Sequence, residues 1–229
     1  MTLEEFKQYN KVQFKNDALL QQAFIHRSFI NENTRSGFEH NERLEFLGDS
    51  VLELVVTEYL YETYPHQNEG DLTAYRSALV NAITLGSVAD SLRFNDMIKL
   101  SKGEAKDVSR ARSSILADAY EAFIGALYLD QGYDVAKEFI ARTVLVRTKD
   151  IIKKGLYKDA KSFVQEKSQE LYGITPAYNV LSEEGPDHDK IFKVGIYFGD
   201  EVVAEGEGKS KQEAETVAAK NALEKKGWA

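Results

Sequence analysis

The chain has 229 residues, a formal net charge of −8 and no cysteine, and 43% of its residues are hydrophobic. The length allows one large domain plus a small one with a buried core, and the lack of cysteine excludes disulfides and thiolate metal sites. The first residues carry no secretory signal and no apolar run approaches the roughly 20 residues that cross a bilayer, so we expect a cytoplasmic protein without a membrane partner.

The negative charge bears on the class of partner. From residue 157 onward there are 10 lysines against 14 acidic residues, so this part carries −4 and the part before it carries the other −4. Neither part attracts phosphate through its overall field. A nucleic-acid partner must therefore be bound by locally placed charges.

The first 147 residues are predicted to form an all-α domain. Apolar residues recur there at spacings of three and four, and glycines and polar clusters separate the periodic stretches. The predicted helices cover residues 17–29, 41–61, 71–92, 111–129 and 133–146.

The pattern changes after a short charged connector at residues 148–157. Residues 191–198 alternate strictly, which places Phe192, Val194, Ile196 and Phe198 on one face of a strand. The remaining elements are a helix at residues 159–172, strands at 176–182 and 201–206, and a last helix that opens with the capping box of Ser210 and Glu213. Residues 158–229 are therefore predicted to form a small α+β domain in the order α-β-β-β-α, which makes the chain multidomain.

The predicted helix at residues 41–61 carries a narrow acidic stripe. At roughly 100° per residue, its four acids fall within about 80° of arc, and apolar side chains cover most of the remainder. The acids are Glu42, Glu45, Asp49 and Glu53. Like charges at this spacing repel one another, and no lysine or arginine shares the stripe. Gly48, between Glu45 and Asp49 in the sequence, lowers helix stability, for which close packing of another helix is the expected reason.

A second acid pair lies in a more apolar helix. Asp118 and Glu121 are the two charged residues between positions 115 and 129, and their spacing places them on one side. Acids in apolar helices without cationic partners suit hard cations with oxygen ligands, such as Mg²⁺. The alternative is that the acids lie at a solvated edge or pair with arginines, for which the candidates are Arg43, Arg76, Arg110 and Arg112.

Three segments of the chain, in order, resemble the ribonuclease III family. They are NERLEFLGDS at residues 41–50, EGDLTAYRSALV at 69–80 and SILADAYEA at 114–122. The resemblance implies Mg²⁺-dependent hydrolysis of double-stranded RNA, with Mn²⁺ as a substitute ion and no organic cofactor. It also implies 5′-phosphate and 3′-hydroxyl ends with short 3′ overhangs, and ribosomal RNA precursors among the substrates.

The resemblance extends to individual positions. The four acids that match the family's metal site are Glu45, Asp49, Asp118 and Glu121, of which Asp49 and Glu121 are the expected catalytic residues. Glu42 and Glu69 match accessory acids near the site and the subunit interface. The family forms homodimers, and Phe46 matches an aromatic residue that packs across the interface, although a place in the monomer's core is the alternative. His26 is expected to be structural and not a metal ligand.

The tail resembles a double-stranded RNA-binding domain, which reads the shape of the duplex and needs no dense basic patch. The matching RNA-contacting positions are Ser162, Gln165, Glu166 and Gln169 in the first helix, His188 in the loop at residues 185–188, and Lys209 and Lys211 at the start of the last helix. The alternative for the two lysines is a solvated helix cap. Four acids, Asp187, Asp189, Glu205 and Glu207, are expected near this surface. Because of their negative charge, we expect modest affinity for double-stranded RNA, with a strong dependence on salt.

Two other function classes compete with the endonuclease. A double-stranded RNA-binding protein without cleavage, such as a ribosome component or RNA chaperone, would keep the fold, but the intact acids argue against it. A helical metal hydrolase acting on nucleotides would explain the acids and would leave the tail without a role.

Overall fold

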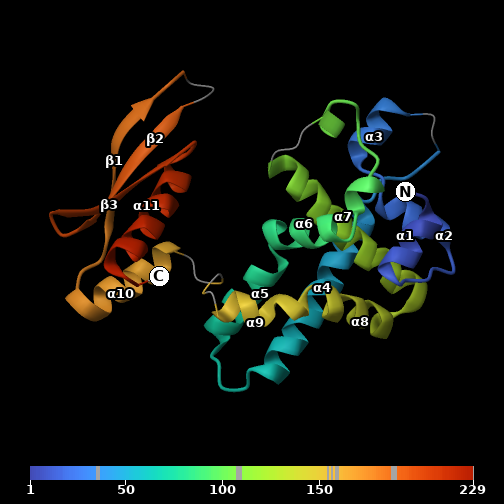
Figure 1. The fold of residues 1–229 in the computed structure, drawn as a ribbon, viewed down its shortest axis with the longest axis horizontal. Coiled ribbons are helices and arrows are strands. Elements are labelled where there is room, and N and C mark those ends of the chain that lie inside the picture. The colour runs from blue at the N-terminus through green and yellow to red at the C-terminus, as the bar shows by residue number, and fades with distance from the viewer. Residues whose placement is uncertain are drawn as a thin grey trace. The chain divides into compact units, whose positions relative to one another are not determined.

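The computed structural model describes residues 1–34, 37–106, 110–153, 155, 157, 160–186 and 190–228, and the chain divides into two compact units, Met1–Lys154 and Gly155–Ala229. Figure 1 shows a helical first unit and a second unit in which helices pack on a small sheet. The predicted fold class, an all-α domain followed by an α-β-β-β-α domain, is confirmed.

The described part of the first unit consists of α-helices joined by short loops and 3₁₀ turns. The helices are α1 (Leu3–Asn10), α2 (Asp17–Ala23), α3 (Arg27–Glu32), α4 (Glu42–Thr63), α5 (Glu69–Val80), α6 (Ala82–Ser91), α7 (Arg110–Gln131), α8 (Tyr133–Thr143) and α9 (Thr148–Lys153). Helix α1 was not predicted. Its N-terminal signal is the capping box of Thr2 and Glu5, in which each side chain accepts the other's backbone N–H.

Two predicted helices are each split into two. The segment at residues 17–29 breaks after α2, where Ile25 forms a bridge with Lys99, and the His26 side chain then caps α3. The segment at residues 71–92 breaks at Asn81, whose extended backbone ends α5 and whose side chain accepts the N–H of Thr84 to start α6. In both cases the apolar pattern continues without interruption, but a polar residue within it, His26 or Asn81, caps a new helix.

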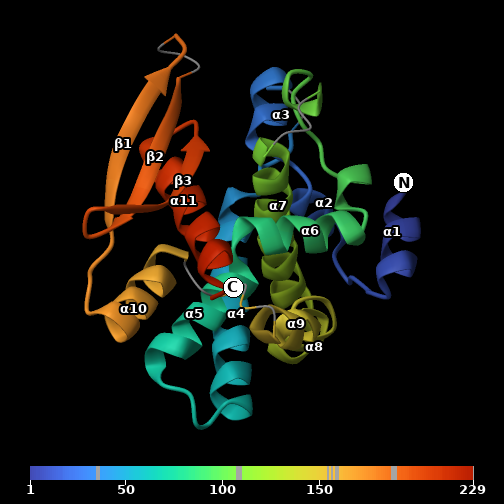
Figure 2. The same ribbon diagram turned by 60° about the vertical axis from the view of Figure 1, so that its left-hand side comes forward.

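Helices α4 and α7 cross in the middle of the first unit, and both views show the other helices around them (Figures 1 and 2). The core beside them contains a group of buried aromatic rings from distant parts of the chain. The ring of Phe6 lies edge-on to those of Phe24, Phe94 and Phe123, with centroids 5.0–5.9 Å apart. This packing holds α1, α2 and the turn after α6 against α7.

Residues 148–153 of the predicted connector form α9, which packs against α5 and buries Thr148 and Ile151. They therefore belong to the first compact unit.

The second unit has the predicted order of elements. They are α10 (Ala160–Tyr172), β1 (Ala177–Glu184), β2 (Ile191–Phe198), β3 (Glu201–Gly208) and α11 (Lys211–Lys226). The strands form an antiparallel sheet in the order β1-β2-β3. The alternation predicted for β2 is confirmed, because Val194, Ile196 and Phe198 are buried on the face that the helices cover. No helix among the described residues has the length and apolar character required to span a membrane.

Candidate metal centre and RNA-binding surface

The crossing of α4 and α7 brings the two acid pairs together. Each helix has a glycine at the crossing, Gly48 on α4 and Gly125 on α7, so the backbones meet without side chains between them. A Cβ atom at Gly48 would lie 2.7 Å from the backbone nitrogen of Gly125 and closer still to the carbonyl of Glu121. The prediction that Gly48 permits close helix packing is confirmed. Gly125 was missed, although it follows Glu121 by one helical turn.

Three of the four predicted metal-site acids form a cluster. One oxygen atom from each of Glu45, Asp118 and Glu121 lies within 4.8 Å of the other two, and all three side chains are partly buried. Asp49 lies outside this set of three and is exposed. Its charge nevertheless acts on Glu45 and Glu121, so it belongs to the same electrostatic neighbourhood.

The cluster is electrostatically unfavourable when all its members are ionised. Burial, reinforced by the charges of Asp49, Asp118 and Glu45, raises the pKa of Glu121 to about 8. Burial and the neighbouring carboxylates likewise raise the pKa of Glu45 to about 7. Burial also raises the pKa of Asp118, and the nearby His26 partly offsets this. A bound cation would relieve this repulsion.

The arginine alternative is not supported where the side chains are described. Arg76 donates to Thr57 and Arg112 to Asn95, and none of the ion pairs among the described side chains involves Glu45, Asp118 or Glu121. The donor set of the cluster consists of carboxylate oxygens, which fits a hard divalent cation and not a metal that prefers sulfur or imidazole.

Neither accessory acid belongs to the set of three, although the charge of Glu42 acts on Glu45. Glu42 pairs with Arg27 at 3.0 Å, with His40 at 3.6 Å on its other oxygen. Glu69 starts α5, where it accepts from Thr73 at 3.4 Å, and it lines a cavity of about 470 Å³ between α4 and α5. His26 accepts the backbone N–H of Ser28 as the N-cap of α3, which is a structural role.

Phe46 points away from the core. It is 79% exposed, so the alternative that it is a core residue of the monomer is wrong. Leu54 and Tyr61, on the same helix, are also exposed.

In the second unit, α10 carries the four residues predicted to meet a minor groove, Ser162, Gln165, Glu166 and Gln169. Ser162 and Gln165 line a hollow of about 490 Å³ together with Gln212 and Thr216 of α11. Gln169 donates to Thr175 at 3.1 Å. His188, Asp187 and Asp189 lie outside the described residues.

The start of α11 has the predicted cap. The hydroxyl of Ser210 accepts the N–H of Glu213, and the Glu213 carboxylate accepts the N–H of Lys209. Lys211 is the first residue of the helix and is well exposed.

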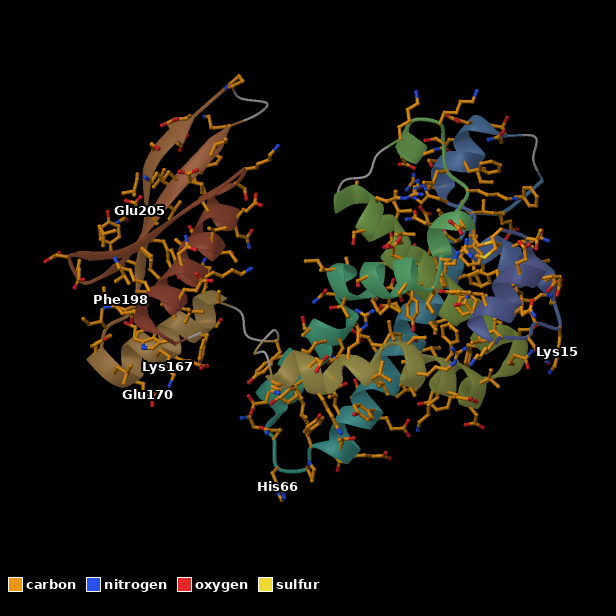
Figure 3. All side chains as sticks on the ribbon, in the orientation of Figure 1. Lys15, His66, Lys167, Glu170, Phe198 and Glu205 are labelled. Carbon is orange, nitrogen blue, oxygen red and sulfur yellow. The ribbon has the colours of Figure 1, made fainter. Side chains whose placement is uncertain are left out.

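The expected position of two acids was wrong. Glu205 and Glu207 pair with Gly195 and Lys193 of β2, on the sheet face opposite to that carrying Val194 and Ile196. Glycines 206 and 208 of β3 face α11 instead. Figure 3 shows Glu205 on the side of the sheet away from α11. Among the described residues, Glu183 lies 3.2 Å from the ammonium group of Lys211, a predicted RNA-binding lysine, and the sequence pattern did not single it out.

Comparisons with known proteins agree with this arrangement. A family model described as Ribonuclease-III-like matches residues 16–148, and one described as Double-stranded RNA binding motif matches residues 160–226. The chain is 44% identical over 221 residues to Ribonuclease 3 of Borreliella afzelii, covering 96% of this chain and 90% of the relative. It is 46% identical over 216 residues to Ribonuclease 3 of Bdellovibrio bacteriovorus, covering 93% and 92%.

A solved structure, the nuclease domain of ribonuclease III from Campylobacter jejuni, matches with 40% identity and a TM-score of 0.57, covering 62% of this chain and 96% of that one. That structure shows flexibility in a region involved in dimer formation of the Campylobacter jejuni nuclease domain. The two family models together cover both units, and each of the two relatives aligns with both units. The combination of a helical nuclease unit and an RNA-binding tail is therefore shared with these relatives. The chain thus belongs to the ribonuclease III family of double-stranded-RNA-specific endoribonucleases, with a double-stranded RNA-binding motif after its nuclease domain.

Proposed function

We propose that this protein is a Mg²⁺-dependent endoribonuclease that hydrolyses phosphodiester bonds in double-stranded RNA and leaves 5′-phosphate and 3′-hydroxyl ends with short 3′ overhangs. The observation that carries the proposal is the cluster of Glu45, Asp118 and Glu121, three partly buried carboxylates with raised pKa values that form no ion pair among the described side chains.

Glu45, Asp49, Asp118 and Glu121 would hold the ion. A bound divalent cation supplies charge stabilisation on the phosphoryl group and a more acidic water as the nucleophile. Glu121, with a pKa of about 8, holds its proton most firmly in the cation-free protein and must lose it to serve as a ligand. Asp49 is exposed at the edge of the cluster and can face a substrate phosphate. We assign the catalytic roles to Asp49 and Glu121, with Mn²⁺ as a replacement ion.

The accessory acids would act around this centre. The Arg27 ion pair holds Glu42 at the edge of the acidic stripe, and the start of α5 holds Glu69 beside the cavity. Neither Glu42 nor Glu69 is among the residues whose carboxylate oxygens form the cluster, which is consistent with supporting roles.

We propose the following division of labour. Residues 1–147 form the catalytic and dimerisation domain, and residues 158–229 form the RNA-binding domain. Residues 148–157 connect them, with α9 of this connector packed on the first unit. RNA contacts are assigned to Ser162, Gln165, Glu166, Gln169, His188, Lys209 and Lys211. The hollow between α10 and α11 supports this assignment, because it presents hydroxyl and amide groups suited to 2′-hydroxyls and sugar edges.

We further propose a homodimer built on α4. Phe46, Leu54 and Tyr61 are all exposed, and at roughly 100° per residue they fall within about 80° of arc beside the acidic stripe. Exposed apolar side chains gathered on one face mark an interface. In the proposed dimer, the cavity that Tyr61 and Glu69 help to line would accept an apolar side chain of the second copy.

The proposed setting is the bacterial cytoplasm, with ribosomal RNA precursors and other structured transcripts as substrates. The relatives named above are bacterial.

The test is incubation of the purified protein with a long RNA duplex and Mg²⁺, followed by analysis of the product ends. The wild type should cut the duplex, whereas Glu121→Gln should bind it without cutting. Glu62→Gln is the matched control, because it removes an exposed carboxylate from the far end of α4 and should cut normally.

The same assay separates the two competing functions. A duplex that stays intact with wild-type protein and Mg²⁺ would favour the non-cleaving RNA-binding protein. Cutting that is unaffected when residues 158–229 are deleted would favour a hydrolase that does not use the tail.

A further inference from the structure

Glu183, near the end of β1, contacts two lysines from two different elements. Its Oε1 lies 3.2 Å from the Nζ of Lys211 at the start of α11, and its Oε2 lies 3.3 Å from the Nζ of Lys190, which precedes β2. These contacts lower the pKa of Glu183, with Lys211 as the largest cause and Lys190 next. The carboxylate is therefore ionised and shared between two ammonium groups.

The position of Lys211 does not depend on Glu183 alone. Its ammonium group also lies over the ring of Phe192, 5.6 Å from the ring centre, and its backbone belongs to the capped first turn of α11. Phe192 is opposite Glu183 in the strand register. The ring, the helix start and the carboxylate thus surround one exposed ammonium group, and two of the three remain when the carboxylate is neutralised.

A carboxylate and an RNA phosphate are both anions that accept hydrogen bonds from lysine. At a separation of about 3 Å from Nζ, Glu183 occupies part of the space around the cation that a phosphate oxygen needs, and its charge repels the phosphate. The side chains of Lys211 and Glu183 are 57% and 36% exposed, so the pair is open to solvent and to a ligand. Such an exposed pair adds little to stability.

We propose that Glu183 is an internal counter-ion of the RNA-binding surface: in the RNA-free protein it offsets part of the positive charge of Lys211 and Lys190, and an RNA phosphate displaces it on binding. The inference rests on the RNA-binding role proposed for Lys211. Glu183 acts on RNA through the lysines and is a positioning residue that sets affinity. The modest affinity expected from the sequence would then come from Glu183, since Glu205 and Glu207 lie on the opposite face of the sheet.

The test measures binding of the full-length protein to an RNA duplex of about 20 base pairs, in chelator so that the RNA stays intact. Glu183→Gln removes the charge and keeps the shape, so it should tighten binding about three-fold at about 50 mM salt, and the gain should disappear at about 300 mM. Glu183→Asp retains the charge and should bind more like the wild type. Glu184→Gln is the matched control, because it makes the same charge change on the other face of β1 and should leave affinity near that of the wild type.

A merely structural role for Glu183 would not produce this dependence on salt. Unchanged or weaker binding by Glu183→Gln, with Lys211→Ala weakening binding, overturns the counter-ion role while the RNA-binding role of Lys211 stands. A Lys211→Ala variant that binds as tightly as the wild type overturns the role of Lys211 and the inference with it. In the Lys211→Ala background, Glu183→Gln should give a smaller gain than in the wild type. Thermal melting of each variant establishes that the domain is folded.

Discussion

Gly48 of α4 lies directly against the backbone carbonyl of Glu121 on α7, closer than any side chain would allow. Glu45 lies three residues before Gly48 on α4, and Asp118 and Glu121 lie on α7. The contact between the two backbones therefore brings the acid of α4 next to the acids of α7. The backbone of the helix that carries Glu45 is thus packed against the turn of α7 that carries Glu121. Five consequences of the structure can be tested.

Gly48→Ala should destabilise the protein even though alanine favours helix by about 1 kcal/mol. The added methyl group would collide with backbone, which cannot rotate away as a side chain can, so we expect a net loss of about 1–3 kcal/mol and reduced cleavage. Chemical denaturation and a duplex-cleavage assay measure the two effects. Gly103→Ala is the control, since its nearest neighbour is the Ser101 hydroxyl at 3.9 Å, and it should keep wild-type stability. Equal stabilities for Gly48→Ala and the wild type would contradict the close packing.

The metal-free protein should lose stability as the pH rises from about 5 to about 8. The folded-state pKa of Glu45 is raised to about 7 and that of Glu121 to about 8, so both hold protons that the unfolded chain has already released. Their favourable contribution is present at low pH and is lost as the pH rises through these values. Thermal melting in chelator across this range measures the loss, and Glu121→Gln should make the profile flatter.

Added Mg²⁺ should reverse this dependence on pH. The ligands bind the cation in their deprotonated form, so the stabilisation by Mg²⁺ should be greater at pH 8 than at pH 6. The Glu62→Gln control should behave as the wild type does under both conditions. A melting temperature that is independent of Mg²⁺ at all pH values would count against a metal site at this cluster.

Phe46→Asp should convert the proposed dimer into a monomer. A carboxylate on the exposed apolar face of α4 would be buried without a partner on association. Light scattering coupled to size exclusion gives the mass of the complex. Ile83→Asp is the control, because Ile83 is equally exposed at 79% but lies on α6. Loss of the dimer in both variants, or in neither, would place the interface elsewhere.

Asp130→Asn should loosen the segment between α1 and α2 from the end of α7. The Asp130 carboxylate accepts the backbone N–H of Lys15 at 2.7 Å and that of Asn16 at 2.8 Å. Partial burial acts to raise the pKa of Asp130, but these hydrogen bonds outweigh it and leave the pKa lowered. The stability from this group is present above the pKa of the unfolded state and is lost as the pH falls through the folded value.

At pH 7 we expect the Asp130→Asn variant to lose about 1 kcal/mol of unfolding free energy, because one of the two charge-assisted bonds is replaced by an unfavourable contact with the amide. Chemical denaturation measures it. Asp134→Asn, which removes an exposed carboxylate near by on α8, should have a smaller effect. Equal losses in the two variants would indicate a general charge effect.

The sequence was most informative where a local pattern repeats. The strict alternation of β2 and the capping residues of α11 predicted those elements closely, because side-chain direction in a strand and N-cap chemistry are local properties. The splits at Ile25 and Asn81 were missed, since an apolar pattern continues across a break when both pieces pack on the same core. Helix α1 was missed because it is short, with two fully or nearly buried residues, Phe6 and Asn10, in eight.

By itself, the sequence determined the acidic stripes, the family resemblance and the order of the two domains, because residue type and spacing along a helix are sufficient for these. Only the tertiary structure decided which carboxylates meet. It brought Glu45, Asp118 and Glu121 together, left Asp49 at the edge, exposed Phe46, and placed Glu183 against Lys211. The physical reason is that distances between helices and strands are set by backbone contacts such as that of Gly48 with Glu121, which join residues 73 positions apart (121 − 48).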